Sequence, residues 1–155
     1  MFQVMHMEIC SGLSGEEYNR AIAEYEMLYP HEPNMQLLMI DGYILRKDYG
    51  KALAAVEDLD KMIDKDPLLD FHRAMCYTLL KNEPKRREYL ERLVKNLPDF
   101  EDGVLELITD YLKSNQYEKA KPLIDRYKNN SEFNQSALTM VLYLYPDYKE
   151  KYNSN

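Results

Sequence analysis

Residues that form turns are scarce in this chain. It has 155 residues, of which 5 are glycine and 7 are proline, and it has no tryptophan. A β-rich fold of this length needs more glycine and proline, because these residues separate strands, so their scarcity favours helices. The two cysteines, Cys10 and Cys76, provide neither a disulfide framework nor a metal motif. We expect both to be free, buried thiols.

Long apolar runs are also missing. No stretch approaches the roughly 18 uninterrupted apolar residues of a transmembrane helix. Residues 1–7 lack the basic start and long apolar segment of a signal peptide. We therefore expect a cytoplasmic protein without membrane insertion.

Positive charge is in deficit. The chain has 27 acidic against 20 basic residues and a net charge of −7, so it repels phosphate backbones, which argues against a nucleic-acid partner. The densest basic run is Lys85-Arg86-Arg87, for which we predict a solvated helix face. With 45% hydrophobic and 30% charged residues, the composition is that of a folded chain, and its length suits one domain.

The clearest pattern in the chain is a repeat of 34 residues. Apolar side chains recur at this interval in four series: Ile22, Val56, Leu90 and Ile124; Tyr25, Leu59, Leu93 and Tyr127; Ile40, Ala74, Ile108 and Leu142; and Tyr43, Tyr77, Tyr111 and Tyr145. Within one period the apolar residues have helical spacing. A short polar break, Ser114-Asn115-Gln116, divides the period. Each unit is therefore predicted to be a helix, a short turn and an antiparallel helix.

Start and stop signals define the predicted helices. Ser14 followed by Glu17 forms a capping box, and Pro30 and Pro98 each follow a helix. The predicted helices cover residues 2–10, 14–29, 34–46, 49–65, 68–81, 84–96, 100–114, 117–129 and 132–145. Pro146 is expected to end the last helix, which has no partner and is followed by a polar tail. This gives one domain over 1–155, with repeats at about 1–33, 34–66, 67–100 and 101–131 and a capping helix at 132–146.

The repeat resembles the tetratricopeptide repeat (TPR). The shared features are the period, a tyrosine in the first helix, an alanine early in the second and a proline near the junction. The best match is carried by Val104, Leu107, Ile108, Tyr111, Tyr117, Ala120, Ile124 and Tyr127. The resemblance implies an all-α, right-handed superhelix of about four helix-turn-helix repeats plus the capping helix. The sequence departs from the TPR pattern where Ile40, Ile108, Tyr18 and Arg86 replace small residues.

The resemblance also implies a function. In TPR-like arrays the first helices line a concave groove that binds a peptide or helix of a partner protein. The residues expected on that side are Leu37, Asp41, Ile44, Leu45, Phe71, Met75, Leu79, Leu105, Thr109, Leu112 and Tyr143. A largely apolar surface of this kind suits a hydrophobic peptide or an amphipathic helix. Two alternatives stay open: self-association through the same face, and burial of these residues as core, since helix 34–46 is apolar nearly all round.

No motif in the sequence indicates an enzyme. The three histidines, His6, His31 and His72, lack metal-ligand spacing, and there is no phosphate-binding glycine loop. The candidate carboxylates are expected on solvent faces: Glu16, Glu17, Asp58, Asp60, Glu101 and Asp102. We therefore expect a protein-binding adaptor or scaffold with no catalytic residue, metal ligand or cofactor.

Overall fold

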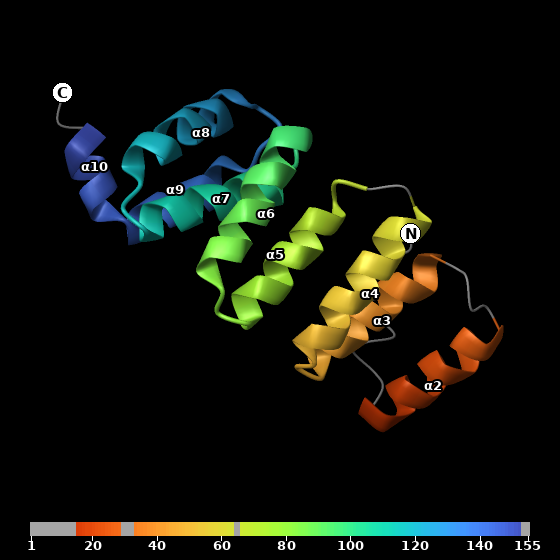
Figure 1. Cartoon of the computed structure of the whole chain (residues 1–155). Helices are drawn as coiled ribbons and strands as arrows, with labels where there is room; N and C mark the ends of the chain where they lie inside the picture. The colour runs from red at the N-terminus through yellow and green to blue at the C-terminus, as the bar shows by residue number, and fades with distance from the viewer. Residues whose placement is uncertain (1–14, 29–32, 64–65, 153–155) are drawn as a thin grey trace. The chain divides into compact units, whose positions relative to one another are not determined.

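The computed structural model describes residues 15–28, 33–63 and 66–152, and over these ranges the chain is all-helical, with no strand (Figure 1). The helices are α2 (Gly15–Leu28), α3 (Pro33–Leu45), α4 (Tyr49–Met62), α5 (Leu69–Leu79), α6 (Glu83–Asn96), α7 (Glu101–Lys113), α8 (Tyr117–Asn129), α9 (Gln135–Leu144) and α10 (Pro146–Tyr152). The predicted helix over 2–10 lies outside the described residues, as do His6, Cys10, Ser14, Pro30 and His31.

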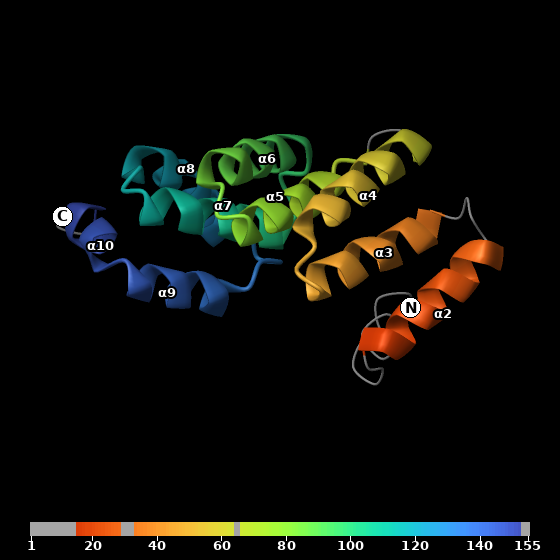
Figure 2. The same ribbon diagram turned by 60° about the horizontal axis from the view of Figure 1, so that its bottom comes forward.

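The chain divides into two compact units, which we call unit 1 (Met1–Arg86) and unit 2 (Arg87–Asn155). In unit 1, α3 packs against α4, with α2 and α5 beside them. In unit 2, α7 packs against α8, α8 against α9, and α9 against α10 (Figure 2). Helices adjacent in sequence are thus packed in pairs. The single domain and the superhelix stay predictions.

The turns after α3, α5 and α7 have the same backbone geometry. Each contains one residue with a left-handed φ, and these residues are spaced by 34: Lys47 (61°), Lys81 (56°) and Asn115 (57°). The amide of Asp48 donates to the carbonyl of Tyr43 at 2.9 Å, which satisfies a carbonyl at the helix end. The same bond joins Asn82 to Tyr77 and Gln116 to Tyr111. The 34-residue period therefore describes backbone structure as well as sequence.

Many of the apolar repeat positions lie in the cores of the two units. In unit 1 the core contains Ile40, Ala55, Val56, Leu59 and Leu69. In unit 2 the buried residues include Leu90, Leu93, Val104, Ile108, Ala120, Ile124 and Tyr127. Cys76 is a free, buried thiol, as predicted. The bulky Ile40 and Ile108 are fully buried where a TPR usually has a small residue.

The end of unit 2 differs from the prediction, because Pro146 begins α10 instead of opening a polar tail. Proline is tolerated in the first turn of a helix, where its missing N–H would have no partner within the helix. Tyr148 of α10 is buried, with its ring edge-on to that of Tyr117 at 5.9 Å. Lys151 and Tyr152 both donate hydrogen bonds to Glu118 of α8. The prediction of an unpartnered terminal helix was therefore wrong.

Unit 1 contains a cluster of charges around the buried Arg73. Arg73 of α5, with a side chain 4% exposed, donates to Glu57 and Asp60 of α4 at 2.8 Å and to Asp70 at 3.0 Å. Burial disfavours the cation, but the hydrogen bonds to Glu57 and Asp60 outweigh it, so the pKa of Arg73 is raised. The expectation that Asp60 faces solvent was wrong, because its carboxylate is an internal partner of Arg73.

The predicted solvated face at Lys85-Arg86-Arg87 was also wrong for both arginines. Arg86 is buried in unit 1, and its Nε donates to the Thr78 hydroxyl at 3.0 Å. Arg87 of unit 2 forms an ion pair at 2.5 Å with the buried carboxylate of Asp110. Since a buried polar group must find a hydrogen-bond partner, both guanidinium groups contribute to the structure.

The expectation that Glu101 faces solvent was wrong as well. Its carboxylate, half-buried at the start of α7, accepts hydrogen bonds from the Tyr127 hydroxyl of α8 and from the amide of Asn134 just before α9. The Asn134 side chain in turn accepts hydrogen bonds from the amides of Ser136 and Ala137 and caps α9. The helix therefore begins at Gln135, whereas the prediction had it begin at residue 132. Glu101 thus joins three successive elements of unit 2.

Candidate functional site

The first candidate site is an apolar surface on α3 and α5 in unit 1. We call it the α3–α5 surface, and it consists of Leu37, Asp41, Ile44, Leu45, Phe71, Met75 and Leu79. Residues 37, 41 and 45 are spaced by four and so share one side of α3. Residues 71, 75 and 79 occupy the same repeat positions on α5, each 34 residues later. The 34-residue period therefore places these residues on equivalent sides of α3 and α5.

Some residues of this surface are exposed and others are packed. Leu45 is 63% exposed, Met75 41% and Leu79 39%. Leu37 and Ile44 are half-buried and pack against the core of unit 1. Burial as core therefore describes Leu37 and Ile44. An exposed apolar surface describes Leu45, Met75 and Leu79.

Asp41 of α3 interacts electrostatically with Cys76 of α5. Burial, with a contribution from the Asp41 carboxylate, raises the pKa of the Cys76 thiol to about 11. Asp41 and Phe71 are both half-buried. At neutral pH the thiol keeps its proton and is a weak nucleophile, because the thiolate is the reactive form.

The remaining predicted groove residues lie in unit 2 and differ in their exposure to solvent. Leu105 and Thr109 are half-buried on α7, where the Thr109 hydroxyl donates to the Leu105 carbonyl at 2.8 Å. Leu112 is 1% exposed and belongs to the core, so its placement on a binding surface was wrong. Leu112 is seven residues after Leu105, on the edge of the stripe that faces inward. Tyr143 of α9 is 78% exposed.

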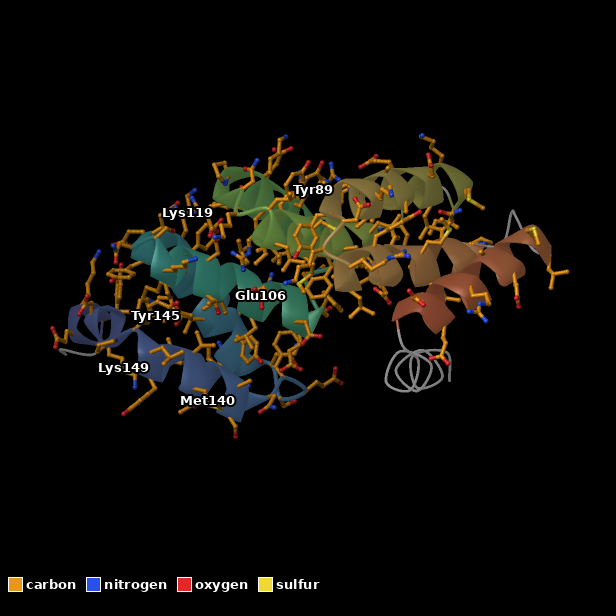
Figure 3. The ribbon with its side chains drawn as sticks, turned by 90° about the horizontal axis from the view of Figure 1, so that it is seen from below. Tyr89, Glu106, Lys119, Met140, Tyr145 and Lys149 are labelled. Atoms are coloured by element: carbon orange, nitrogen blue, oxygen red, sulfur yellow. The ribbon has the colours of Figure 1, made fainter. Side chains whose placement is uncertain are left out.

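Helix α9 carries a second apolar surface, most of which the groove prediction missed. Met140 is 71% exposed and Leu144 70%, beside Tyr143. Ser136 and Thr139 are exposed on the same side. We call these five residues the α9 outer face; Figure 3 labels Met140 on this helix. The signal in the sequence was an uncharged stretch over residues 133–146.

A third feature is a depression of about 650 Å³ in unit 2, between α6, α7 and α8. Its lining includes Val94, Leu107, Tyr111 and Leu123, with Glu91, Lys95, Glu118, Lys119 and Arg126 among them. The Tyr111 hydroxyl donates to Glu91 at 2.7 Å. Burial and this bond raise the pKa of Tyr111. The depression opens to solvent and mixes both signs of charge, so its lining indicates no particular ligand.

The described residues also include a half-buried histidine on α5. His72 is half-buried, with Nδ1 3.3 Å from the Leu68 carbonyl oxygen. Across residues 15–28, 33–63 and 66–152, no three His, Cys, Asp or Glu side chains form a group that could hold a metal ion. None of the helices described in those ranges is long and apolar enough to cross a membrane.

Comparisons of the chain with protein-family models, curated proteins and solved structures each gave no significant match. The resemblance to the TPR therefore depends on the 34-residue pattern of this chain alone.

Proposed function

We propose that the chain is a non-catalytic protein-binding module whose α3–α5 surface accepts an apolar peptide or amphipathic helix of a partner protein. The observation that carries this proposal is the exposure of Leu45 on α3 and of Met75 and Leu79 on α5, where Leu45 and Leu79 occupy equivalent repeat positions. Exposed apolar side chains gathered on one surface are typical of interaction sites.

The chemistry of the surface defines the class of partner. Met75 is unbranched and polarizable, so it can adapt to different apolar side chains. Leu45 and Leu79 provide apolar contact, as in helix-in-groove recognition. The net charge of −7 disfavours an acidic segment. The expected partner is a neutral or basic segment with an apolar stripe.

Two matched methionine substitutions test the proposal. Met75 on α5 and Met62 on α4 are each 41% exposed, and Met62 lies outside the α3–α5 surface. A partner is first isolated from lysate with the wild-type chain and purified, and its affinity for each variant is then measured by calorimetry. We expect Met75→Lys to weaken binding by about tenfold or more, the effect of a central contact residue. Met62→Lys should leave affinity unchanged.

Equal affinities of the two variants for the partner would exclude the α3–α5 surface as the binding site. Circular dichroism of each variant verifies that the helices are intact. The same pair of variants tests the alternative of self-association through this surface: if the wild type is an oligomer and only Met75→Lys dissociates it, the α3–α5 surface binds another copy of the chain.

A further inference from the structure

The outer face of α9 is apolar although its inner face already contributes to the core of unit 2. Leu138 and Leu142 are buried, while Met140, Tyr143 and Leu144 are exposed. A helix that is apolar on both sides is normally covered on both sides. Figure 2 shows α7 and α8 on one side of α9 only.

This face is distinguished by its lack of charge. Residues 133–146 contain no Asp, Glu, Lys, Arg or His, in a chain where 30% of residues are charged and the net charge is −7. Two copies of an acidic chain repel each other over most of their surfaces. An uncharged apolar face allows them to meet without placing like charges in contact.

The order of side chains along the face suits antiparallel pairing. The small side chain of Ser136 lies at its beginning, and the large side chains of Tyr143 and Leu144 lie at its end. If two α9 helices cross antiparallel about Met140, Leu144 of one copy lies opposite Ser136 of the other, and Met140 meets Met140. A parallel pair would instead place Tyr143 against Tyr143 and Ser136 against Ser136, which overpacks one end and leaves a gap at the other.

We infer that the α9 outer face binds a second copy of this chain, with the two α9 helices antiparallel about a two-fold axis at Met140. Such an interface uses the same patch on both copies, as in most homodimers. It lies in unit 2 and does not depend on the partner proposed for the α3–α5 surface.

Complementary charges at position 140 test this pairing. Analytical ultracentrifugation should show that the wild type is a dimer. Met140→Glu and Met140→Lys should each weaken dimerisation by about tenfold or more, because each places two like charges together on the axis. An equimolar mixture of the two variants should form a heterodimer, because the two charges are then opposite. Met62→Glu, at an exposed methionine of unit 1, should leave the dimer intact.

Several outcomes would overturn the inference. One is a wild type that stays monomeric at the highest concentration reached. Another is a dimer that neither substitution at Met140 weakens. If both variants are monomeric, folded by circular dichroism, and do not associate when mixed, the pairing about Met140 is wrong. A monomeric wild type that binds a different protein through α9 would also overturn it.

Discussion

Units 1 and 2 have side chains of opposite chemistry at several equivalent repeat positions. In unit 1, Asp60, Asp70 and Arg73 form an ion cluster together with Glu57. Thirty-four residues later, unit 2 has Val94, Val104 and Leu107, all buried, and Glu91. The positions of Asp70 and Arg73 are buried in both units, whereas the polarity of the side chain there varies when the neighbouring helix changes with it.

The reverse exchange occurs at another pair of positions. Unit 2 has the ion pair of Arg87 with Asp110, while the equivalent residues of unit 1 are Leu53 and Cys76. Burying a charge is costly unless it is paired and hydrogen-bonded. Both members of each interaction must therefore differ between the units, because one charge alone would be destabilising.

The largest expected effect comes from removing one member of the unit 1 cluster. Arg73→Leu gives unit 1 the residue type that unit 2 has at the equivalent position, Leu107. The carboxylates of the cluster then have no arginine to pair with. The substitution should lower the free energy of unfolding by about 3–5 kcal/mol, the usual cost of breaking a buried ion pair. Urea denaturation measures the change, with the exposed Arg126→Leu as a control expected to stay within about 0.5 kcal/mol of the wild type.

Replacing Asp60 and Asp70 together with Arg73 tests whether unit 1 tolerates the apolar residues of unit 2. The triple variant Asp60→Val, Asp70→Val, Arg73→Leu gives unit 1 the residues of unit 2 at these positions, since Glu57 already matches Glu91. It should regain the stability lost by Arg73→Leu and exceed the wild type by about 1–4 kcal/mol, as apolar replacements of buried ion pairs have done. A triple variant as unstable as Arg73→Leu would show that the apolar residues of unit 2 cannot replace the ion cluster of unit 1.

A smaller effect is expected at Gly103, whose equivalent in unit 1 is Leu69. A Cβ at Gly103 would lie 2.7 Å from Leu93 Cδ2 and 2.9 Å from Phe100 Cδ1, so packing in unit 2 has no room for it. Gly103→Ala should destabilise the protein by about 1–3 kcal/mol through overpacking. Gly50→Ala, where a Cβ meets nothing within 4 Å, should stabilise it by up to about 1 kcal/mol. The melting temperature of each variant measures the effect, and equal changes in melting temperature for Gly103→Ala and Gly50→Ala would contradict this prediction.

The smallest effect concerns alkaline pH. Burial, with smaller contributions led by the charge of Asp125, raises the pKa of Tyr148 from 10.0 to about 12. A raised pKa means that the folded protein holds this proton more tightly, so the stabilisation is complete below pH 10 and is lost as the pH rises towards 12. Tyr148→Phe should therefore lose less stability over that interval than the wild type, as measured by thermal unfolding at several pH values. Tyr89→Phe in the same unit is the control. If Tyr148→Phe and the wild type have the same pH profile, Tyr148 does not contribute.

The period alone predicted much of the local structure. It indicated the helical hairpins and the burial of positions such as Ile40, Val56 and Ile124, because apolar residues at helical spacing can be covered only by packing helices together. It did not reveal α10, since Pro146 suits the first turn of a helix as well as the end of one. The placement of Leu112 on the groove was wrong because the buried side of α7 is wide enough to include Leu112 beside Ile108 and Tyr111.

The sequence by itself determined that this protein is built from helices with a 34-residue period, since turn residues and apolar side chains recur at that interval. Tertiary structure decided where the charges go. Arg73, Arg87 and Glu101 are all of types normally found on the surface, and their sequence positions do not show that carboxylates or hydroxyls from neighbouring helices meet them. Only the packed chain brings such partners within hydrogen-bond distance, and that distance determines whether a buried charge is tolerated.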